Sequence, residues 1–452
     1  MEDILYLAAA ICFIFAIKGL SSTESALRGN IFGVAGMFLA CIAACTVIDI
    51  SNLSFIISAV LVGGVIGIAI AQTISMTILP QMIAGFHSLV GLAAVFVAFA
   101  VYFVTNAESA IAPYGCSKLR FLEMGIGAAI GAITFSGSIV AFLKFYGVGR
   151  KYRIHPALNA FLGSSIACLL TYFMSSGNEN TFVLLTVCSF IVGVTLIAPI
   201  GGADMPIVVS LLNSCSGWAT SGIGFSLHND LLIIVGALVG ASGAILSYIM
   251  CKSMNRSLRA VIFTLESERS VSQQATKTKA FRQGAPEDAA YILKNANSVI
   301  VVPGYGMATS QAQHVLKEMG DILTTAGIRV RYAIHPVAGR IPGHMNVLLA
   351  EANVSYDEVF ELNEINRDFS SCDVAYVIGA NDVTNPAARK DSSSLIYGMP
   401  ILEVEKAKVI LFLKRSMGVG YAGVDNELFY AQNTMMLLGD AKKTTEAIVK
   451  AM

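Results

Sequence analysis

The sequence VPGYGMATSQAQ, residues 302–313, follows a β-branched run and precedes a segment with helical spacing. Residues 298–304 (SVIVVPG) are typical of a buried strand. After the glycines, apolar residues recur at helical spacing as far as Gly327, which can end a helix. A strand, a glycine-rich turn and a helix in this order form the usual cradle for the pyrophosphate of a dinucleotide.

Two glycines define the turn, and each has a physical role in such a cradle. Gly304 permits a tight turn, and Gly306 lets backbone amides approach a pyrophosphate. The N-terminus of the following helix then faces the negative charge. Thr309 occupies the third glycine position of the usual fingerprint, so the prediction depends on the strand and helix around the motif.

Three further strand-like runs follow along the chain. They are residues 328–336 (IRVRYAIHP), 373–379 (DVAYVIG) and 407–413 (AKVILFL), with helical stretches between them. Strands that alternate with helices predict a Rossmann-like α/β domain with a doubly wound parallel sheet.

The residues that follow two of these strands indicate which dinucleotide is bound. An NAD-binding fold usually places Asp or Glu after its second strand, whereas here that strand is followed by Arg340 and no acid. The strand at 407–413 is followed by Lys414, Arg415 and Ser416, which suit a 2′-phosphate. A solvated basic turn is the ordinary alternative, but the joint pattern favours NADP over NAD.

Polar side chains also follow the strand at 373–379. Asn381, Asp382 and Asn385 fall at the edge where open α/β sheets bind ligands. A role for Asp382 in capping the loop is the alternative.

The first part of the chain has a different composition. Hydrophobic residues make up 55% of the whole chain and charged residues only 13%, against about 25% in ordinary soluble proteins. Residues 1–259 hold 11 of the 30 Lys and Arg, so a bilayer part precedes a water-exposed part. The zero net charge predicts no nucleic-acid partner. The nine Cys show no metal-ligand spacing or disulfide framework, so no metal is expected.

Apolar runs of spanning length predict a polytopic α-helical bundle of about nine transmembrane helices, since a span needs about 20 residues. The runs lie near residues 4–18, 31–48, 53–74, 81–104, 121–143, 156–174, 181–199, 206–226 and 231–250. The acidic N-terminus lacks the basic region and cleavage site of a signal peptide, so we expect the first span to be retained. Basic residues concentrate in one set of loops, which places the N-terminus outside and the C-terminal domain in the cytoplasm.

Polar side chains within spans are costly and often functional. His87 is the only histidine within a predicted span and can pass a proton near neutral pH, although a structural hydrogen bond is its alternative role. Asn213 can join helices or hold a water in a proton path, and the sequence leaves both roles open. Asp204, before Pro206, fits a helix cap or a proton entry, and Glu123 stands at the outer start of a span.

A polar segment separates the two parts of the chain. We expect a transmembrane proton-translocating domain at residues 1–251, a linker at 252–284 and a cytoplasmic NADP(H)-binding domain at 285–452. Within the first domain, Gly127 and Gly131, like Gly236 and Gly240, are spaced for close helix packing.

Several motifs occur together in a fixed order. They are FHSLVGLAAVFV, MPIVVSLLNSCSGW, VPGYGMATSQAQ, HPVAGRIPGHMNVLLAEANV, GANDVTNPAA, YGMPILEV, KRSMGVGYAGVDNELFY and LLGDAKK. With these motifs the chain closely resembles the β subunits of proton-translocating NAD(P) transhydrogenases over essentially its whole length. Thr309 and the order of Val383 and Thr384 are small departures from the family pattern.

The resemblance implies a membrane oxidoreductase of the Si-specific/Re-specific type. It would transfer hydride from NADH to NADP⁺, regenerate NADPH and couple this reaction to proton movement into the cytoplasm. NADP(H) is expected on this chain and NAD(H) on a partner α subunit, with αβ protomers forming a dimer. The expected location is the bacterial inner membrane, with multiple spans and a periplasmic N-terminus. No catalytic side chain is expected, because hydride passes directly between two nicotinamides.

Site residues follow from the resemblance by position. His87 and Asn213 would belong to the proton path, and Asp204 and Glu123 are further candidates from their positions at the ends of spans. In the family, NADP lies on the fold in reversed orientation under a loop that matches residues 414–423. The NADP site would be lined by Gly304, Tyr305, Gly306, Met307, Ala308, Thr309, Val337, Ala338, Gly339, Arg340, Ile341, Gly379, Ala380, Asn381, Asp382, Val383, Gly398, Met399, Lys414, Arg415, Ser416, Met417, Gly418, Val419, Gly420, Tyr421, Asp440 and Ala441.

Two alternatives from other functional classes stay open. One is an ion channel or transporter gated by a regulatory NADP-binding domain. The absence of an obvious selectivity filter or substrate site in the sequence counts against it. The other is a membrane-anchored NADP-binding scaffold, which leaves His87 without a purpose.

Overall fold

The computed structural model describes residues 2–20, 25–47, 50–75, 78–111, 118–147, 155–201, 204–254, 257–263, 280–341, 343–392, 394, 396–418, 420 and 422–452. Contacts divide the chain into two compact units. The first comprises Met1–Ser75, Gln81–Ala198 and Ser210–Ile245, and the second comprises Met76–Pro80, Pro199–Val209 and Leu246–Met452.

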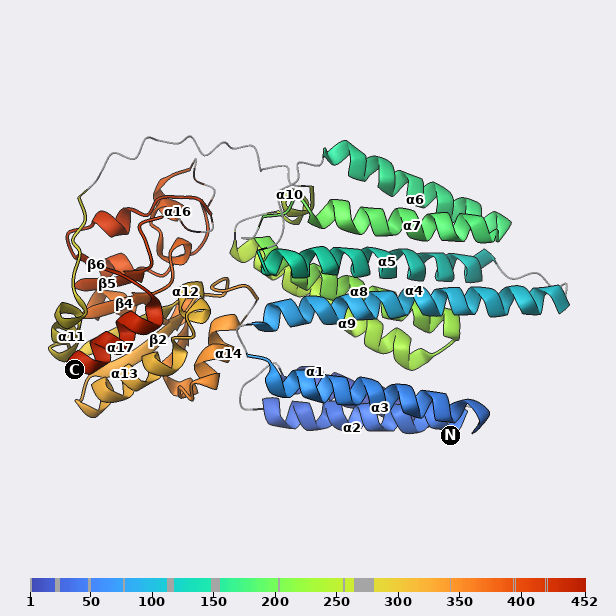
Figure 1. Ribbon diagram of the computed structural model, residues 1–452, viewed down its shortest axis with the longest axis horizontal. Coiled ribbons are helices and arrows are strands. Elements are labelled where there is room, and N and C mark those ends of the chain that lie inside the picture. The colour runs from blue at the N-terminus through green and yellow to red at the C-terminus, as the bar shows by residue number, and fades with distance from the viewer. Residues whose placement is uncertain are drawn as a thin grey trace. The chain divides into compact units, whose positions relative to one another are not determined.

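Long helices make up the first unit and extend into the second, and all of the predicted spans are helical. Figure 1 labels these helices as α1 (Glu2–Leu20), α2 (Ala26–Val47), α3 (Ile50–Thr73), α4 (Leu79–Ile111), α5 (Lys118–Phe145), α6 (Pro156–Ser176), α7 (Glu179–Ile197), α8 (Met205–Leu227) and α9 (Asp230–Ser253). Among the described residues, seven are long and apolar enough to cross a membrane. The apolar part of α1 is shorter, and α8 is not among the seven because Asn213 and several serines make it more polar. The predicted membrane bundle is confirmed, with a count close to the expected nine.

The outer surface of the bundle is apolar. On α3, Phe55, Val60 and Leu61 are 76%, 66% and 62% exposed, and none of its apolar window Ser54–Thr73 is buried. In water such a surface would be unfavourable, whereas it matches the hydrocarbon of a bilayer. By length and by surface, these helices suit a membrane.

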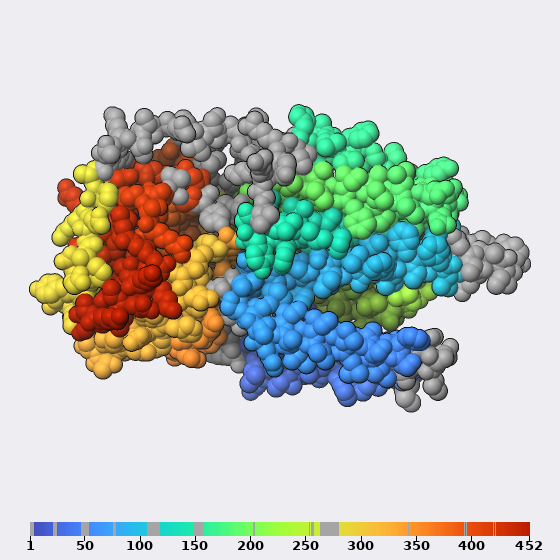
Figure 2. Space-filling model, viewed as in Figure 1, coloured from blue at the N-terminus to red at the C-terminus, as the bar shows by residue number. Residues whose placement is uncertain are grey.

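Glycines bring the helices of the bundle into close contact. A Cβ on Gly131 of α5 would lie 2.8 Å from the carbonyl oxygen of Gly91 on α4. A Cβ on Gly236 of α9 would lie 2.4 Å from the backbone nitrogen of Ser221 on α8. On α1, a Cβ on Gly19 would lie 2.5 Å from the Cα of Gly29 on α2, and Figure 2 shows the blue N-terminal helices closely packed. The glycine spacing seen in the sequence therefore marks helix crossings, as small residues do in membrane bundles.

The second unit contains a six-stranded parallel sheet in the order β3-β2-β1-β4-β5-β6. Its strands are β1 (Ser298–Pro303), β2 (Arg329–Ile334), β3 (Val359–Glu361), β4 (Val374–Ile378), β5 (Val409–Lys414) and β6 (Thr434–Leu438). Its α-helices after the linker are α11 (Pro286–Lys294), α12 (Tyr305–Thr309), α13 (Gln313–Thr325), α14 (His344–Glu351), α15 (Leu362–Ile365), α16 (Ala387–Lys390) and α17 (Ala441–Ala451). The strand order reverses between β1 and β4, which is the switch point where doubly wound sheets bind ligands.

The predicted doubly wound fold is confirmed, and four of its strands were predicted. The other two strands, β3 and β6, carry weaker signals. Strand β3 has only three residues, and β6 (TMMLL) is a Met- and Leu-rich run that fits a buried helix as well.

Register shows which helices cover the same face of the sheet. Val301 pairs with both Tyr332 and Tyr376, so the two tyrosines point to one face. A Cβ on Gly320 of α13 would lie 2.5 Å from the Tyr332 hydroxyl, and the Tyr376 hydroxyl bonds Thr445 of α17 at 3.1 Å. Helices α13 and α17 therefore cover this face, and Figure 1 shows them side by side in front of the sheet.

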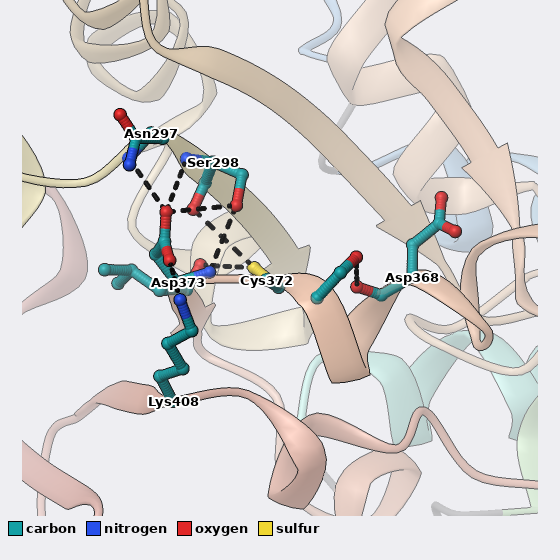
Figure 3. A network of polar contacts seen from close by, with 8 residues as sticks. Asn297, Ser298, Asp368, Cys372, Asp373 and Lys408 are labelled. Atoms are coloured by element: carbon teal, nitrogen blue, oxygen red, sulfur yellow. Dashed lines mark hydrogen bonds and ion pairs between the residues drawn. The ribbon is translucent and has the colours of Figure 1, made fainter.

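The amino edge of the sheet is closed by a polar network, shown in Figure 3. Directly before β4, Asp373 accepts hydrogen bonds from the backbone nitrogens of Asn297 and Ser298 at 2.9 and 3.1 Å. Its other carboxylate oxygen pairs with Lys408, before β5, at 2.7 Å. The Cys372 thiol lies against the Ser298 carbonyl at 3.7 Å. One carboxylate thus ties the starts of β1, β4 and β5 together.

Candidate functional site

The glycine turn after β1 lies directly against the end of β4. The backbone nitrogens of Gly304 and Gly306 donate to the carbonyl oxygens of Ile378 and Gly379, each at 2.9 Å. A Cβ on Gly304 would lie 2.4 Å from the Cα of Ala380, and one on Gly306 would lie 2.6 Å from the Cα of Gly379. Gly304 has an extended φ of −137°, which any residue adopts. Glycine is therefore required at 304 because this backbone lies close to the backbone of Ala380. The tight turn that we predicted is not the reason.

Two helices follow the strand β1, the first of them within the predicted turn. A short helix, α12, ends at Thr309, and α13 begins only at Gln313. Between them Gln311 has a φ of 51°, which is incompatible with a continuous helix. The helix predicted after the turn is therefore α13, which starts a few residues later than expected and is followed by Gly327, with a φ of 84°, as expected, whereas the residues predicted as a turn form the short helix α12.

A cavity of about 280 Å³ opens at the carboxyl edge of the sheet, at the switch point. Of the residues predicted for the NADP site, it is lined by Gly304, Tyr305, Gly306, Val337, Ala338, Gly339, Arg340, Gly379, Ala380, Asn381, Asp382, Val383, Met399, Lys414, Arg415 and Gly420. The fold thus gathers the ends of β1, β2, β4 and β5 around one space.

Other predicted residues lie elsewhere. Thr309 and Ala441 line a smaller cavity of about 100 Å³ that shares Lys414 and Arg415 with the larger one. Met307 and Ala308 are buried in the core of the sheet. Neither cavity is bordered by Ile341, Gly398, Ser416, Met417, Gly418 or Asp440. Val419 and Tyr421 lie outside the described residues.

Three cations border the larger cavity. The Arg340 guanidinium lies 4.5 Å from the centre of the Tyr305 ring. Lys414 donates to the Gly418 carbonyl at 2.5 Å, and burial lowers its pKa although nearby acids oppose that shift. Arg415 bonds the Ser310 hydroxyl and the Asp440 carboxylate, each at 3.3 Å. Such an arrangement suits a ligand with several negative charges.

Two buried histidines follow β2 beside the cavity. His335 accepts from the backbone nitrogen of Val337 through Nδ1 at 3.2 Å, and its Nε2 donates to the Pro400 carbonyl at 2.7 Å. Burial lowers its pKa to about 4. Burial, followed by the charge of Arg340, also lowers the pKa of His344 to about 4. Both imidazoles are therefore neutral at pH 7 and act as fixed dipoles.

Three side chains tie the segment after β5 to the loop after β4. Asp382 accepts from the backbone nitrogen of Ala422 at 3.0 Å, and Asn385 donates to the Asp425 carbonyl at 2.9 Å. Asn426 bonds the Asn381 side chain at 3.1 Å. The sequence singled out the loop after β4 but gave no signal for Ala422 or Asn426, because neither lies in a periodic pattern or a charged run.

Within the bundle, a hydrogen bond of His87 joins the helices α4 and α8. His87 Nδ1 on α4 lies 3.2 Å from the Ser216 hydroxyl on α8, and Ser216 also donates to the Leu212 carbonyl at 3.0 Å. Since the hydroxyl has one proton, His87 then donates through Nδ1, and in the neutral imidazole Nε2 is left as an acceptor. Asn213 lies one turn before Ser216 on α8 and is half-buried. The sequence did not predict the role of Ser216.

Of the other two proton-path candidates, Glu123 lies apart from His87. Glu123 is half-buried near the start of α5, two turns before Gly131, which contacts α4 at Gly91. His87 lies one turn beyond Gly91 in the opposite direction, so the two side chains are separated by about 18 Å along the bundle. Asp204 is buried directly before α8 and belongs to the second unit. Among the described residues, no group of acids, histidines or cysteines could hold a metal ion.

Comparison with known proteins points to one family. A family model described as NAD(P) transhydrogenase beta subunit matches residues 2–451. A Rhodospirillum rubrum protein named NAD(P) transhydrogenase subunit beta is 55% identical over 454 aligned residues, which cover 99% of this chain and 98% of the relative. The protein of the same name from R. rubrum strain ATCC 11170 is similar to the same extent.

Proposed function

This chain belongs to the NAD(P) transhydrogenase beta subunit family, and from that membership we propose that it binds NADP(H) at the carboxyl edge of its sheet. Hydride would reach that site from NADH on the α subunit that a β subunit implies. The reaction would be coupled to proton movement into the cytoplasm. The observation that carries the proposal is the cavity at the switch point, which backbone glycines and three cations border.

The residues around the cavity fit a dinucleotide. The backbone carries no side chain where a pyrophosphate would lie, at Gly304, Gly306 and Gly379. A side chain at any of the three would clash with neighbouring backbone. Arg340, Lys414 and Arg415 supply positive charge. When bound, the dinucleotide supplies the hydride chemistry, and this chain's residues bind, orient and exclude water.

Charge around the cavity favours NADP(H) over NAD(H). No acid follows β2 to hold a ribose 2′-hydroxyl, and Lys414 and Arg415 follow β5. These two residues also line the smaller cavity, together with Ser310. A phosphate there would lie beside two cations and Ser310. We propose this place for the 2′-phosphate.

Proximity would supply most of the rate enhancement. Direct hydride transfer between nicotinamides needs no acid or base, and the neutral state of His335 and His344 agrees with a site that moves no proton. Proton coupling would then act through binding. The state of His87 would shift the nucleotide domain between a form that exchanges NADP(H) and a form that holds it.

The contact between His87 and Ser216 supports a place for proton transfer between α4 and α8. Asn213, one turn away, would extend the path by holding a water. We further propose an N-terminus in the periplasm, a cytoplasmic nucleotide domain and a dimer of αβ protomers in the inner membrane, because the basic loops and the family resemblance support this topology.

Vesicles that carry both subunits test the proposed function. NADPH should form from NADH and NADP⁺, the rate should rise when a proton gradient directed into the cytoplasmic side is imposed, and an uncoupler should remove that rise. His87→Ala should abolish proton-coupled turnover while NADP⁺ still binds. Normal proton pumping by this variant, or no NADPH formation by the unaltered complex, would contradict the proposal.

A further inference from the structure

Asn426 is a fully buried polar residue at the end of the segment that follows β5. It is 0% exposed and directly precedes the 3₁₀ helix η7 (Glu427–Tyr430). Its Oδ1 accepts from the backbone nitrogen of Leu428 at 3.0 Å and caps that helix. Because Oδ1 is occupied in this way, the orientation of the Asn426 amide is fixed and its Nδ2 points the other way.

The Nδ2 of Asn426 bonds Asn381, in the loop that follows β4. It donates to the Asn381 carbonyl at 3.3 Å and to the Asn381 Oδ1 at 3.1 Å. A donor facing Oδ1 sets the orientation of the second amide as well. Asn426 therefore determines which side of the Asn381 carboxamide remains available.

The remaining side of Asn381 is a hydrogen-bond donor at the cavity. Its Nδ2 is buried and has no hydrogen-bond partner within the described part of the chain. A Cβ on Gly420 would lie 2.3 Å from this nitrogen, and both residues line the cavity. A buried N–H group without a partner costs free energy unless a ligand satisfies it.

We propose that Asn426 is a positioning residue for the bound dinucleotide. It acts through Asn381, whose Nδ2 it directs toward an oxygen acceptor of the ligand, and it ties residues 422–425 to the loop that makes this contact. The inference rests on the proposed binding of NADP(H) at this edge. It adds a residue that does not border the cavity.

Two substitutions of Asn426 separate its two hydrogen bonds. Asn426→Ser keeps an oxygen that can cap η7, as Ser355 does for the 3₁₀ helix η3 (Tyr356–Glu358), but its side chain is too short to hold Asn381. Asn426→Asp keeps the cap and the size but turns an acceptor toward Asn381. The Asn381 amide would then rotate to donate to Asp, and its oxygen would face the ligand.

A matched control lies at the other edge of the sheet. Asn433 Nδ2 donates to the Ala407 carbonyl at 3.0 Å, so Asn433→Asp also removes one amide–carbonyl bond. Neither Asn433 nor Ala407 lines a cavity at the carboxyl edge. This variant reports the effect of lost stability alone.

Equilibrium titration of the purified αβ complex with NADP⁺ tests the proposal. The dissociation constant should rise in the order unaltered chain, Asn426→Ser, Asn426→Asp, with the last raised between about tenfold and a hundredfold. The KM for NADH should stay unchanged, and Asn433→Asp should bind NADP⁺ within about twofold of the unaltered complex.

Two results would overturn the proposal. One is unaltered NADP⁺ affinity in Asn426→Ser and Asn426→Asp. The other is that Asn433→Asp loses as much NADP⁺ affinity as the Asn426 variants for the same fall in thermal midpoint. If Asn426→Asp does not fold, Asn426→Ser decides alone. Absence of NADP⁺ binding by the unaltered complex would instead refute the proposed function, so the two failures are distinguishable.

Discussion

The polar cluster around Asp373 at the amino edge of the sheet and the one around Asn381 at the carboxyl edge differ in how their hydrogen bonds are satisfied. At the amino edge, the Asp373 carboxylate receives two backbone N–H groups and an ammonium, and the network is closed. At the carboxyl edge, Asn381 Nδ2 and His344 Nε2 are buried without a hydrogen-bond partner among the described residues. Satisfied groups stabilise a fold, whereas unsatisfied ones mark a place for a ligand. The Asp373 cluster therefore holds strands of the sheet together, whereas the Asn381 cluster has a donor left for a bound ligand.

The largest effect should follow a change at the carboxyl edge. Gly379 has a φ of 67°, and a Cβ there would lie 2.4 Å from the Cα of Gly306. Gly379→Ala would strain the backbone and push the two glycine loops apart. We expect NADP⁺ affinity to fall by more than about a hundredfold, measured by titration of the αβ complex. Near-normal affinity would show that the loops need not approach so closely.

Acid should destabilise the carboxyl edge through its histidines. The pKa of His335 and of His344 is about 4 in the folded chain, below the ordinary 6.5, so the unfolded chain binds more protons between these values. Stability is therefore full above pH 6.5 and falls as the pH drops toward 4, by roughly 2 kcal/mol for each residue at pH 5.

Thermal midpoints of the solubilised chain at pH 7 and pH 5 would measure this loss. His335→Asn cannot titrate, so it should make the pH dependence shallower, by about half. A midpoint that is the same at both pH values would contradict the assignment of neutral histidines.

Asp373→Asn should weaken the amino edge without changing the site. The amide cannot pair with Lys408 as a charge and accepts from Asn297 and Ser298 less strongly. We expect a loss of about 1–3 kcal/mol in the free energy of unfolding, measured by denaturant titration, with unchanged NADP⁺ affinity. A changed affinity at unchanged stability would remove the distinction between the two edges.

The smallest effect should come from a glycine at which an added Cβ would meet no neighbour. Gly327 has a φ of 84°, but a Cβ there would meet nothing within 4 Å. Gly327→Ala therefore shares the backbone strain of Gly379→Ala without its clash, and should cost about 1–2 kcal/mol. NADP⁺ affinity should stay as in the unaltered complex, and a loss as large as that of Gly379→Ala would assign both effects to instability.

The sequence predicted what depends on local pattern. β-Branched runs predicted β1, β2, β4 and β5, and the residues after them placed Arg340, Lys414 and Arg415 at one edge, where the structure has them. Apolar length predicted the membrane helices. The partners of His87 and Asn381 were not predictable, because Ser216 and Asn426 meet them only through packing of distant segments.

Local pattern also failed where backbone geometry decides. Residues 304–309 were predicted as a turn, whereas Tyr305–Thr309 form the short helix α12, which the φ of 51° at Gln311 separates from α13. Glycine at 304 was explained by a turn. Its backbone is in fact extended, and glycine is needed because the Ala380 backbone leaves no room for a side chain.

Equilibrium binding of NADP⁺ and NAD⁺ to the purified full chain, compared side by side, tests the central claim most directly. If the carboxyl edge binds NADP(H), NADP⁺ should bind more tightly than NAD⁺ by about a hundredfold or more, because a phosphate meets two cations. Replacing both Lys414 and Arg415 with Ala should remove most of that ratio while NAD⁺ binding changes little. Equal affinity for the two dinucleotides in the unaltered chain would contradict the account.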